Sequence, residues 1–124
     1  MDQRFEKAQR LRRGREFEVA IRRGSVAADG VLVVFAVQAS DREQVARLGV
    51  TIPRRTGPAV LRNRWKRLIR EAFRTQKAMI PPGHDFVIRP KKGAQPTWPS
   101  IRRSVPLLTR KAVARLAKTS DRTR

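Results

Sequence analysis

One stretch of the chain, from Ala59 to about Met79, most limits what this sequence can fold into. Its apolar residues recur at spacings of three and four, so they form one stripe along a predicted helix, which Pro58 is well placed to open. A stripe of this kind has to be buried against other apolar surface. Its members are Leu61, Trp65, Leu68, Ile69, Ala72 and Phe73.

A flank of the same helix carries cations, with Glu71 as the one acidic residue among them. Like charges three or four residues apart weaken an isolated helix by roughly 0.2–0.5 kcal/mol per pair, so a merely solvated face, the alternative interpretation, normally mixes its signs. We interpret the flank as a ridge that follows phosphate groups, in which Asn63 adds a hydrogen-bonding group for a base edge or a ribose. The ridge consists of Arg62, Lys66, Arg70 and Arg74, with Asn63 and Arg67 beside them.

The whole chain shares this charge imbalance. Its 124 residues include 30 Lys and Arg against 10 Asp and Glu, a net charge of +20, yet 40% of them are hydrophobic. The length predicts one domain over residues 1–124, and the self-repulsion predicts a polyanionic partner. Because most of the cations are arginines, which bind phosphate in bidentate fashion, nucleic acid is favoured over an anionic membrane. A membrane would require an amphipathic helix free to lie in the interface.

Several classes of protein are excluded or disfavoured. The chain has no cysteine, which excludes disulfides, thiolate metal sites and cysteine nucleophiles. The longest apolar run, Val31 to Val37, is far shorter than the roughly 20 residues that span a bilayer, and residues 1–15 do not resemble a signal peptide. We therefore expect a soluble, cytoplasmic protein. The one histidine, His84, follows two prolines and a glycine in a predicted turn, so we expect no catalytic residue and no metal site.

The other elements are read from periodicity and from turn residues. We expect a helix over residues 14–23 capped by Gly24, strands over 31–38, 45–52 and 85–89, and a last helix from Thr97 to about Lys118. Residues 40–44 are a polar connection, and residues 1–9 and 119–124 are expected to be flexible. Pro106 lies inside the last helix, so it should kink that helix or split it near Ser104.

One segment also resembles a known signature. The run from Gly57 to Arg67, GPAVLRNRWKR, is similar to the RNR signature of the bacterial ribonuclease P protein component. The resemblance extends over roughly residues 10–115, because the family's N-terminal pattern, its basic pair before the helix, its strand and its basic last helix follow in register. These features are Arg10-Leu11, Phe17 and Gly24, then Arg54-Arg55, the 85–89 strand and the last helix.

The resemblance implies a fold and a function. The fold would be a single-domain α+β sandwich of order α-β-β-β-α-β-α, similar to the second domain of ribosomal protein S5, with a left-handed β-α-β crossover. The function would be that of the protein subunit of ribonuclease P, an endoribonuclease that matures the 5′ end of tRNA. Its partners would be ribonuclease P RNA and precursor tRNA, with no membrane and no obligate protein partner. No cofactor is expected on the protein itself, since hydrolysis would come from the RNA subunit with Mg²⁺.

The resemblance also implies two sets of site residues. The first would contact the RNA subunit: Arg54, Arg55, Arg62, Asn63, Arg64, Lys66, Arg67 and Arg70. The second would line a cleft for the single-stranded 5′ leader of precursor tRNA: Arg10, Arg12, Phe17 and Val34. For Phe17, packing of its own helix is an equal alternative, whereas we expect Trp65 to be a core residue.

The chain departs from the family pattern at a few positions. Pro53 and Pro58 stand where the family usually has serine and asparagine, which stiffens the loop before the helix. Ile21 and Val34 stand where cleft aromatics are common, so leader binding would depend more on charge. Two other functions stay open from the residues alone. One is a structural, ribosome-associated RNA-binding protein, and the other is a free-standing nuclease, for which no catalytic constellation is visible.

Overall fold

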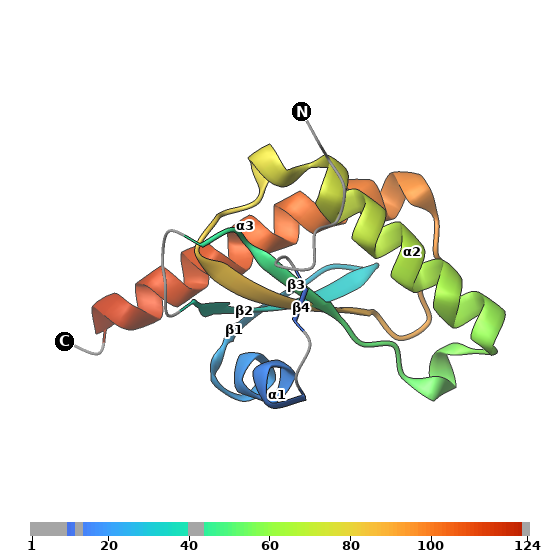
Figure 1. Cartoon of the computed structure of the whole chain (residues 1–124), viewed down its shortest axis with the longest axis horizontal. Helices are drawn as coiled ribbons and strands as arrows, with labels where there is room; N and C mark the ends of the chain where they lie inside the picture. Colours follow the sequence, from blue (N-terminus) through green and yellow to red (C-terminus); the bar gives the residue numbers. More distant parts are fainter. Residues whose placement is uncertain (1–9, 12–13, 40–43, 123–124) are drawn as a thin grey trace.

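The computed structural model describes residues 10–11, 14–39 and 44–122, with side chains as far as Lys118. The element order α-β-β-β-α-β-α agrees with the expected one (Figure 1). The helices and strands are α1 (Gly14–Arg23), β1 (Ser25–Ala28), β2 (Leu32–Gln38), β3 (Arg47–Val50), α2 (Ala59–Thr75), β4 (His84–Pro90) and α3 (Trp98–Arg122). Two 3-10 turns, Arg54–Thr56 and Lys77–Met79, flank α2.

The strands form one sheet in the order β1-β2-β4-β3. β2 pairs antiparallel with both β1 and β4, whereas β3 pairs parallel with β4. Parallel neighbours need a crossover connection, and here α2 is that crossover between β3 and β4. Figure 1 shows α2 and α3 on one face of the sheet and α1 on the other. The fold is therefore a three-layer arrangement with a basic crossover helix on its outside.

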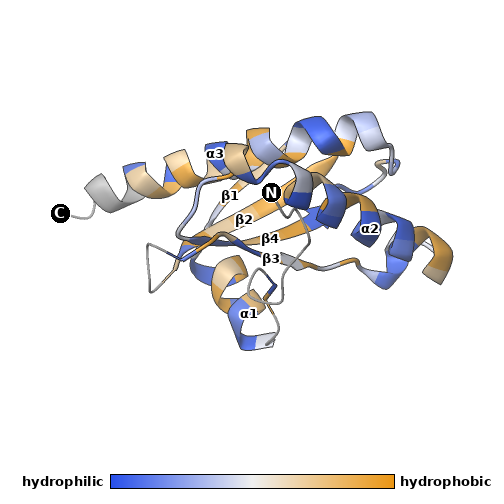
Figure 2. Cartoon of the chain, turned by 45° about the horizontal axis from the view of Figure 1, so that its top comes forward, coloured by the Kyte–Doolittle hydropathy of each residue, from blue (hydrophilic) through white to orange (hydrophobic). Residues whose placement is uncertain are grey.

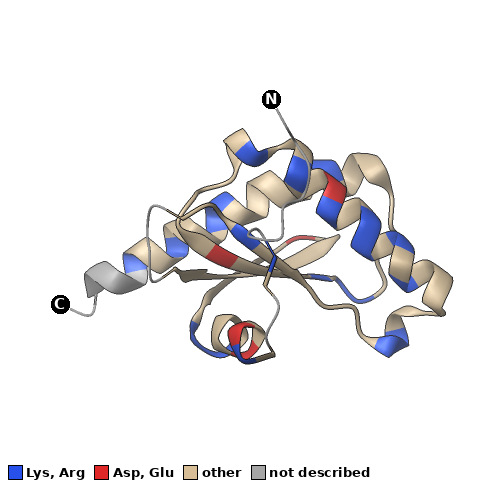
Figure 3. Ribbon diagram, in the orientation of Figure 1, with Lys and Arg blue, Asp and Glu red and all other residues tan. Residues whose placement is uncertain are grey.

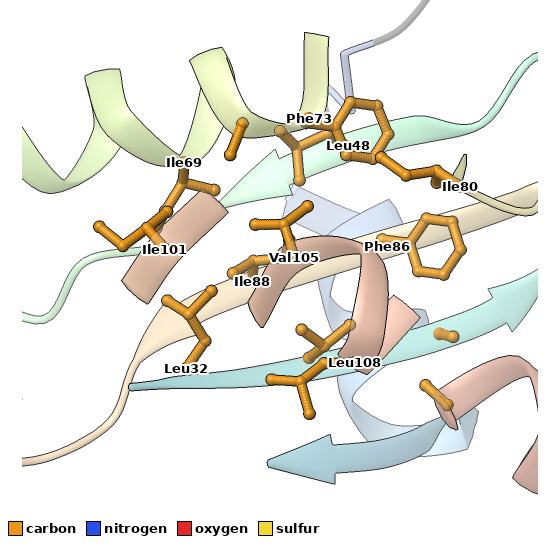
Figure 4. Packing of buried hydrophobic residues seen from close by; sticks show 14 of the residues in the cluster. Leu32, Leu48, Ile69, Phe73, Ile80, Phe86, Ile88, Ile101, Val105 and Leu108 are labelled. Atoms are coloured by element: carbon orange, nitrogen blue, oxygen red, sulfur yellow. The ribbon is translucent and has the colours of Figure 1, made fainter. Parts of the chain in front are cut away.

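The main core lies between the sheet and the pair α2 and α3. Figure 4 shows side chains from both helices meeting those of the sheet, and the Phe73 and Phe86 rings meet edge to face with centroids 6.4 Å apart. Trp65 is fully buried in this core, as expected for a member of the apolar stripe. Figure 2 shows the matching hydrophobic colouring of β2 and β4. The stripe therefore fixes which side of α2 faces outward.

Two strands differ from the expectation. β1 was not recognised in the sequence, because its four residues include two alanines and only Ala27 is fully buried. β3 is shorter than the predicted 45–52 strand, although Leu48, Val50 and Ile52 do share one face and pack on the main core. Gly49 between them faces α1. Short edge strands carry little periodic signal, which explains both differences.

Helix ends follow the chemistry of their residues. Gly24 ends α1 as expected, and a Cβ there would lie 2.3 Å from the Ala20 carbonyl oxygen and 2.4 Å from that of Ala36, so only glycine fits. α2 begins after Pro58 as predicted, but it ends at Thr75 and is followed by a 3-10 turn, not continued to Met79.

Pro106 does not split the last helix, which runs unbroken from Trp98 to Arg122, beyond the predicted end at Lys118. Proline has no N–H, so the carbonyl of Arg102 four residues earlier loses its helical partner. The Gln76 Nε2 amide at the end of α2 donates to that carbonyl at 2.9 Å and also to the Ala72 carbonyl at 2.9 Å. A side chain from a neighbouring helix thus satisfies the group that Pro106 leaves free.

This arrangement predicts energetic coupling between Gln76 and Pro106. Gln76→Ala should lower the free energy of unfolding by about 1 kcal/mol, because the Arg102 carbonyl loses its donor. In a Pro106→Ala background the new N–H can bond to that carbonyl, so Gln76→Ala should cost clearly less. Urea unfolding of the four proteins in a double-mutant cycle measures this. Equal costs in both backgrounds would show that the bond contributes nothing.

The buried side of α3 packs into the core, and Leu107 is the helix's one exposed large hydrophobic residue among the described side chains. Its buried residues are Ile101, Val105, Leu108 and Ala112. α3 is therefore not the free amphipathic helix that interfacial binding to a membrane would require. Among the described residues, no helix is long and apolar enough to cross a bilayer.

Candidate nucleic-acid interface

The outer side of α2 is a shallow basic groove, called the α2 groove below. It is lined by Asn63, Lys66, Arg67, Arg70, Glu71 and Arg74, and encloses about 360 Å³. These are five of the six residues assigned to the ridge from helical spacing, with Glu71 added, and Figure 3 shows how closely cations follow one another along α2. The buried stripe on the opposite side holds this surface toward solvent.

Charges in the α2 groove are crowded. Glu71, the acidic residue that lines the groove, forms an ion pair with Arg74 one turn away. Burial and the positive charge of Arg10 both lower the pKa of Arg70. Arg10 is held there by a parallel bridge to Leu48 beside β3. An anion in the groove would relieve this repulsion, which makes phosphate a fitting ligand.

Arg62 and Arg64 lie at the margins of the α2 groove and have contacts of their own. The Arg62 Nε donates to the Gly57 carbonyl at 3.1 Å, and the Arg64 Nε donates to the Pro96 carbonyl at 3.3 Å. Both side chains therefore help to position loops, while their terminal nitrogens remain available for other bonds. The structure thus places these two predicted RNA contacts at the edge of the site and Arg67 and Arg70 at its centre.

A second basic cleft lies at the end of the sheet. It encloses about 320 Å³ between the turn before α2 and the loop after β4. The cations that line it are Arg55, Arg89, Lys91 and Lys92. Arg54 is exposed in the same turn. The sequence pattern did not identify Arg89, Lys91 and Lys92 as site residues, because the register that brings the β4 end beside Arg55 is a tertiary feature.

The α1 face of the sheet carries two aromatic side chains. The Phe17 ring lies over Gly49, where a Cβ would come within 2.5 Å of it, so it packs on the sheet and is partly exposed. Phe35 has Arg89 over its ring, with the guanidinium carbon 5.1 Å from the centroid. The packing alternative for Phe17 is therefore confirmed, and its part in leader binding stays a prediction.

Val34 does not belong to this face. It is fully buried in the main core beneath α2 and α3, whereas Val33, Phe35 and Val37 face α1. Successive strand residues point to opposite faces, so the assignment of Val34 to the α1 side of the sheet was wrong by one residue, and its neighbour Phe35 lies there. Of the other residues assigned to that cleft, Arg10 lies between β3 and α2, and Arg12 lies outside the described residues.

A carboxylate and arginine cluster joins α1 to the sheet. Arg47 donates two hydrogen bonds of 2.8 Å to Asp85 and forms a 2.7 Å ion pair with Glu16 of α1. Hydrogen bonding to Asp85 is the main cause that raises the pKa of Arg47. Gln44 adds a 3.3 Å bond to Asp85. The sequence analysis missed this cluster, because Asp85 is 38 residues after Arg47 and Glu16 lies far before it, so the members share no motif.

The cluster should contribute measurably to stability. Arg47→Met is expected to lower the free energy of unfolding by about 2 kcal/mol, because it leaves the nearly buried Asp85 carboxylate without its cation. We place the value below that of a fully buried pair because the Arg47 side chain is 26% exposed. Urea unfolding tests this, with Glu18→Gln as control.

Glu18 also pairs with an arginine, Arg22, but both side chains are mostly exposed. The control should therefore change stability by less than about 0.5 kcal/mol. Equal effects of the two variants would mean that the Arg47 cluster is no more than a surface pair.

His84 is the first residue of β4 and not part of the predicted turn, which ends at Gly83; its Nδ1 is 2.7 Å from the Pro82 carbonyl oxygen. No group of three histidine or carboxylate side chains able to hold a metal occurs in the described part of the chain. The surfaces that stand out are therefore the α2 groove, the second cleft and the α1 face.

The fold and these surfaces define a small, basic α+β protein that binds a polyanion. Comparison with known proteins specifies the class further. The family model for Ribonuclease P matches residues 5–113. The ribonuclease P protein component of Shouchella clausii is 32% identical over 109 residues, 87% of this chain and 88% of that protein. That of Petrotoga mobilis is 39% identical over 90 residues, 73% and 75% of the two chains.

Solved structures agree. The Staphylococcus aureus ribonuclease P protein superposes with a TM-score of 0.74 at 29% identity, covering 86% of this chain and 96% of that one. The Thermotoga maritima protein gives a TM-score of 0.70 at 31% identity, covering 82% and 96%. The chain belongs to the family of bacterial ribonuclease P protein components. Family membership implies association with ribonuclease P RNA.

Proposed function

We propose that this subunit holds ribonuclease P RNA through the α2 groove and receives the 5′ leader of precursor tRNA across the second cleft and the α1 face. The observation that carries the proposal is the α2 groove itself. Five polar or cationic side chains and one already paired carboxylate share an outward face whose opposite side is locked into the core. Phosphate binding is the chemistry that such a surface supports best.

The contact set for the RNA subunit follows from this geometry. Asn63, Lys66, Arg67 and Arg70 would lie in the groove, and Arg62 and Arg64 would contact RNA at its margins. Arg54 and Arg55 would contact the same RNA from the turn before α2, where it borders the second cleft. Arg62 and Arg64 already donate through Nε and can offer their terminal nitrogens to phosphate oxygens. Arg74, paired with Glu71, extends the groove at its far end.

The leader site is proposed on different chemistry. A single strand is bound by stacking of its bases on aromatic rings and by cations along its backbone. Phe17 supplies a partly exposed ring on the α1 face, the buried Phe35 beside it carries Arg89 over its ring, and Arg89 connects this face to the second cleft, where Lys91 and Lys92 follow. Arg89 thus belongs to both surfaces. We assign the leader to this path and replace Val34 by Phe35.

Catalysis is proposed to reside in the RNA subunit with Mg²⁺, and the working particle in the cytoplasm. The protein would act by positioning the leader and by lowering the repulsion between two RNA molecules. Mg²⁺ held by the RNA would supply the hydrolytic chemistry. A free-standing nuclease would require an acid and base pair or clustered carboxylates that can hold a metal. The described residues include no group of three metal-ligating side chains, and the two carboxylates that do lie together, Glu16 and Asp85, are both paired with Arg47.

Leader binding is tested by comparing two substrates with the assembled holoenzyme. The variant Arg89→Gln, Lys91→Gln, Lys92→Gln should weaken binding of precursor tRNA that carries a leader by about 10-fold or more. Binding of mature tRNA, which has no leader, should stay within about twofold and is the internal control. Equal losses for both tRNAs would contradict the leader assignment.

A further inference from the structure

The outer side of α3 is basic over its whole described length. Between Trp98 and Lys118 the helix has no acidic residue, and Figure 3 shows the cations along it. We call this surface the α3 face. Its cations, all exposed, are Arg102, Arg103, Arg110, Lys111, Arg115 and Lys118.

Contacts within the protein account for only some of the cations on the α3 face. Arg110 donates to the Met79 carbonyl at 2.8 Å and Arg115 to the Val26 carbonyl at 2.6 Å, so these two also tie α3 to its neighbours. Arg103 lies near Asp29, whose carboxylate accepts a 2.6 Å bond from Ser104. Acidic side chains of the described residues do not pair with Lys111 or Lys118. Cations three, four or seven residues apart then repel one another in the free protein.

The α3 face adjoins the α2 groove. Both helices lie on the same face of the sheet and pack against each other, with their buried sides turned to one core (Figure 1). Gln76 at the end of α2 bonds to the Arg102 carbonyl, and Arg64 of α2 bonds to the Pro96 carbonyl just before α3. The two outer sides therefore point away from the sheet together. A large polyanion seated on α2 would extend over α3.

We propose that the α3 face binds the sugar–phosphate backbone of a double-helical segment of the same ribonuclease P RNA that occupies the α2 groove. This rests on the proposed function, since it assumes that α2 holds that RNA. From Arg103 to Lys118 the face spans about 22 Å along the helix axis, enough for several phosphates of one strand. Its described side chains include no exposed aromatic ring.

The described side chains of the α3 face include no exposed aromatic ring, and this favours double-stranded over single-stranded RNA as its ligand. Single strands are held largely by stacking, whereas double-stranded RNA is recognised by its shape and its phosphates. A convex helix side that offers cations around one exposed aliphatic side chain, Leu107, and no stacking ring fits the second kind. The single-stranded leader is thus assigned to the opposite side of the sheet, where Phe17 and Phe35 lie.

The test uses the full-length chain and a transcribed bacterial ribonuclease P RNA. In the variant Arg103→Gln, Lys111→Gln, Lys118→Gln, affinity at about 0.15 M salt should fall roughly 10- to 100-fold, and the slope of log K against log salt should become shallower by about 2. The matched control, Arg15→Gln, Arg22→Gln, Arg23→Gln, removes three exposed cations from α1 on the other side of the sheet. It should bind within about threefold of the unchanged protein.

Two further measurements separate the possible outcomes. The midpoint of thermal unfolding of the α3 variant should stay close to that of the unchanged protein, because the loss of Lys111 and Lys118 relieves repulsion and the exposed Arg103 only adds to the bonds that already hold Asp29. Weaker binding can then not be ascribed to misfolding. The same titrations with precursor tRNA alone show which of the two RNAs the α3 face binds. Binding by the α3 variant equal to that of the α1 control would overturn the proposal, and so would a loss confined to precursor tRNA.

The failure of the proposed function would look different. The double variant Arg67→Gln, Arg70→Gln reports on the α2 groove independently. If the α3 variant loses affinity for ribonuclease P RNA and the α2 variant does not, the result would support RNA binding by the α3 face and contradict the assignment of the α2 groove. A loss in the α2 variant alone would overturn the α3 proposal and leave the proposed function standing.

Discussion

Replacing Arg67 and Arg70 together by alanine is expected to lower the affinity of the protein for ribonuclease P RNA by about 100-fold or more. Each charge-assisted hydrogen bond to a phosphate contributes roughly 1.5–3 kcal/mol, and these two side chains lie at the centre of the α2 groove. The dependence of binding on salt should also weaken, with the log–log slope reduced by about 1.5. Filter binding across a salt series measures both quantities.

Folding should survive this double change. Arg67 is exposed, and Arg70 is crowded by Arg10, so removing them takes away repulsion and breaks no ion pair among the described residues. Arg15→Ala with Arg23→Ala on α1 is the matched control, because it removes the same charge from the opposite side of the sheet. If the α2 variant unfolds, or if the control loses as much affinity, the groove is not a specific RNA site.

Trp65→Ala is expected to have the largest effect on stability, a loss of about 3–5 kcal/mol in the free energy of unfolding. Trp65 is fully buried between α2 and the rest of the main core, and its removal leaves a cavity beneath the helix that carries the RNA groove. Urea unfolding measures the loss. RNA binding by the fraction that remains folded should be close to normal, because the indole does not reach the outer face.

Trp65→Phe is the control for this prediction. The buried Nε1 has no hydrogen-bond partner among the described residues, so phenylalanine removes an unsatisfied donor along with part of the ring. Its cost should therefore be well below that of alanine, about 1–2 kcal/mol. A large loss of RNA affinity in the stable Trp65→Phe protein would show that the indole contacts RNA and is not a core residue.

Helical periodicity predicted the parts of the site that lie on one element. Spacings of three and four placed the stripe of α2 inward and its cations outward, and the structure confirms both. The glycine after α1 and the proline before α2 likewise marked real helix ends. These signals are local, since a single element determines which of its residues share a side.

The features that sequence reasoning missed depend on distant parts of the chain. A shift of one residue within β2 reverses its face, which is why Val34 was assigned to the cleft where Phe35 lies. Arg47, Asp85 and Glu16 meet only because α1, β3 and β4 do. Of the kink or split expected at Pro106, the split does not occur, because the carbonyl that the proline leaves free finds a partner in Gln76 at the end of α2.

The most direct test of this subunit's role is cleavage of precursor tRNA by a bacterial ribonuclease P RNA at low Mg²⁺, with and without the protein. We expect the protein to stimulate cleavage at the correct 5′ position and the Arg67→Ala, Arg70→Ala variant to lose that stimulation. Tight RNA binding without stimulation would contradict this role and favour a purely structural RNA-binding protein. Cleavage by the purified protein in the absence of any ribonuclease P RNA would contradict the assignment of catalysis to the RNA.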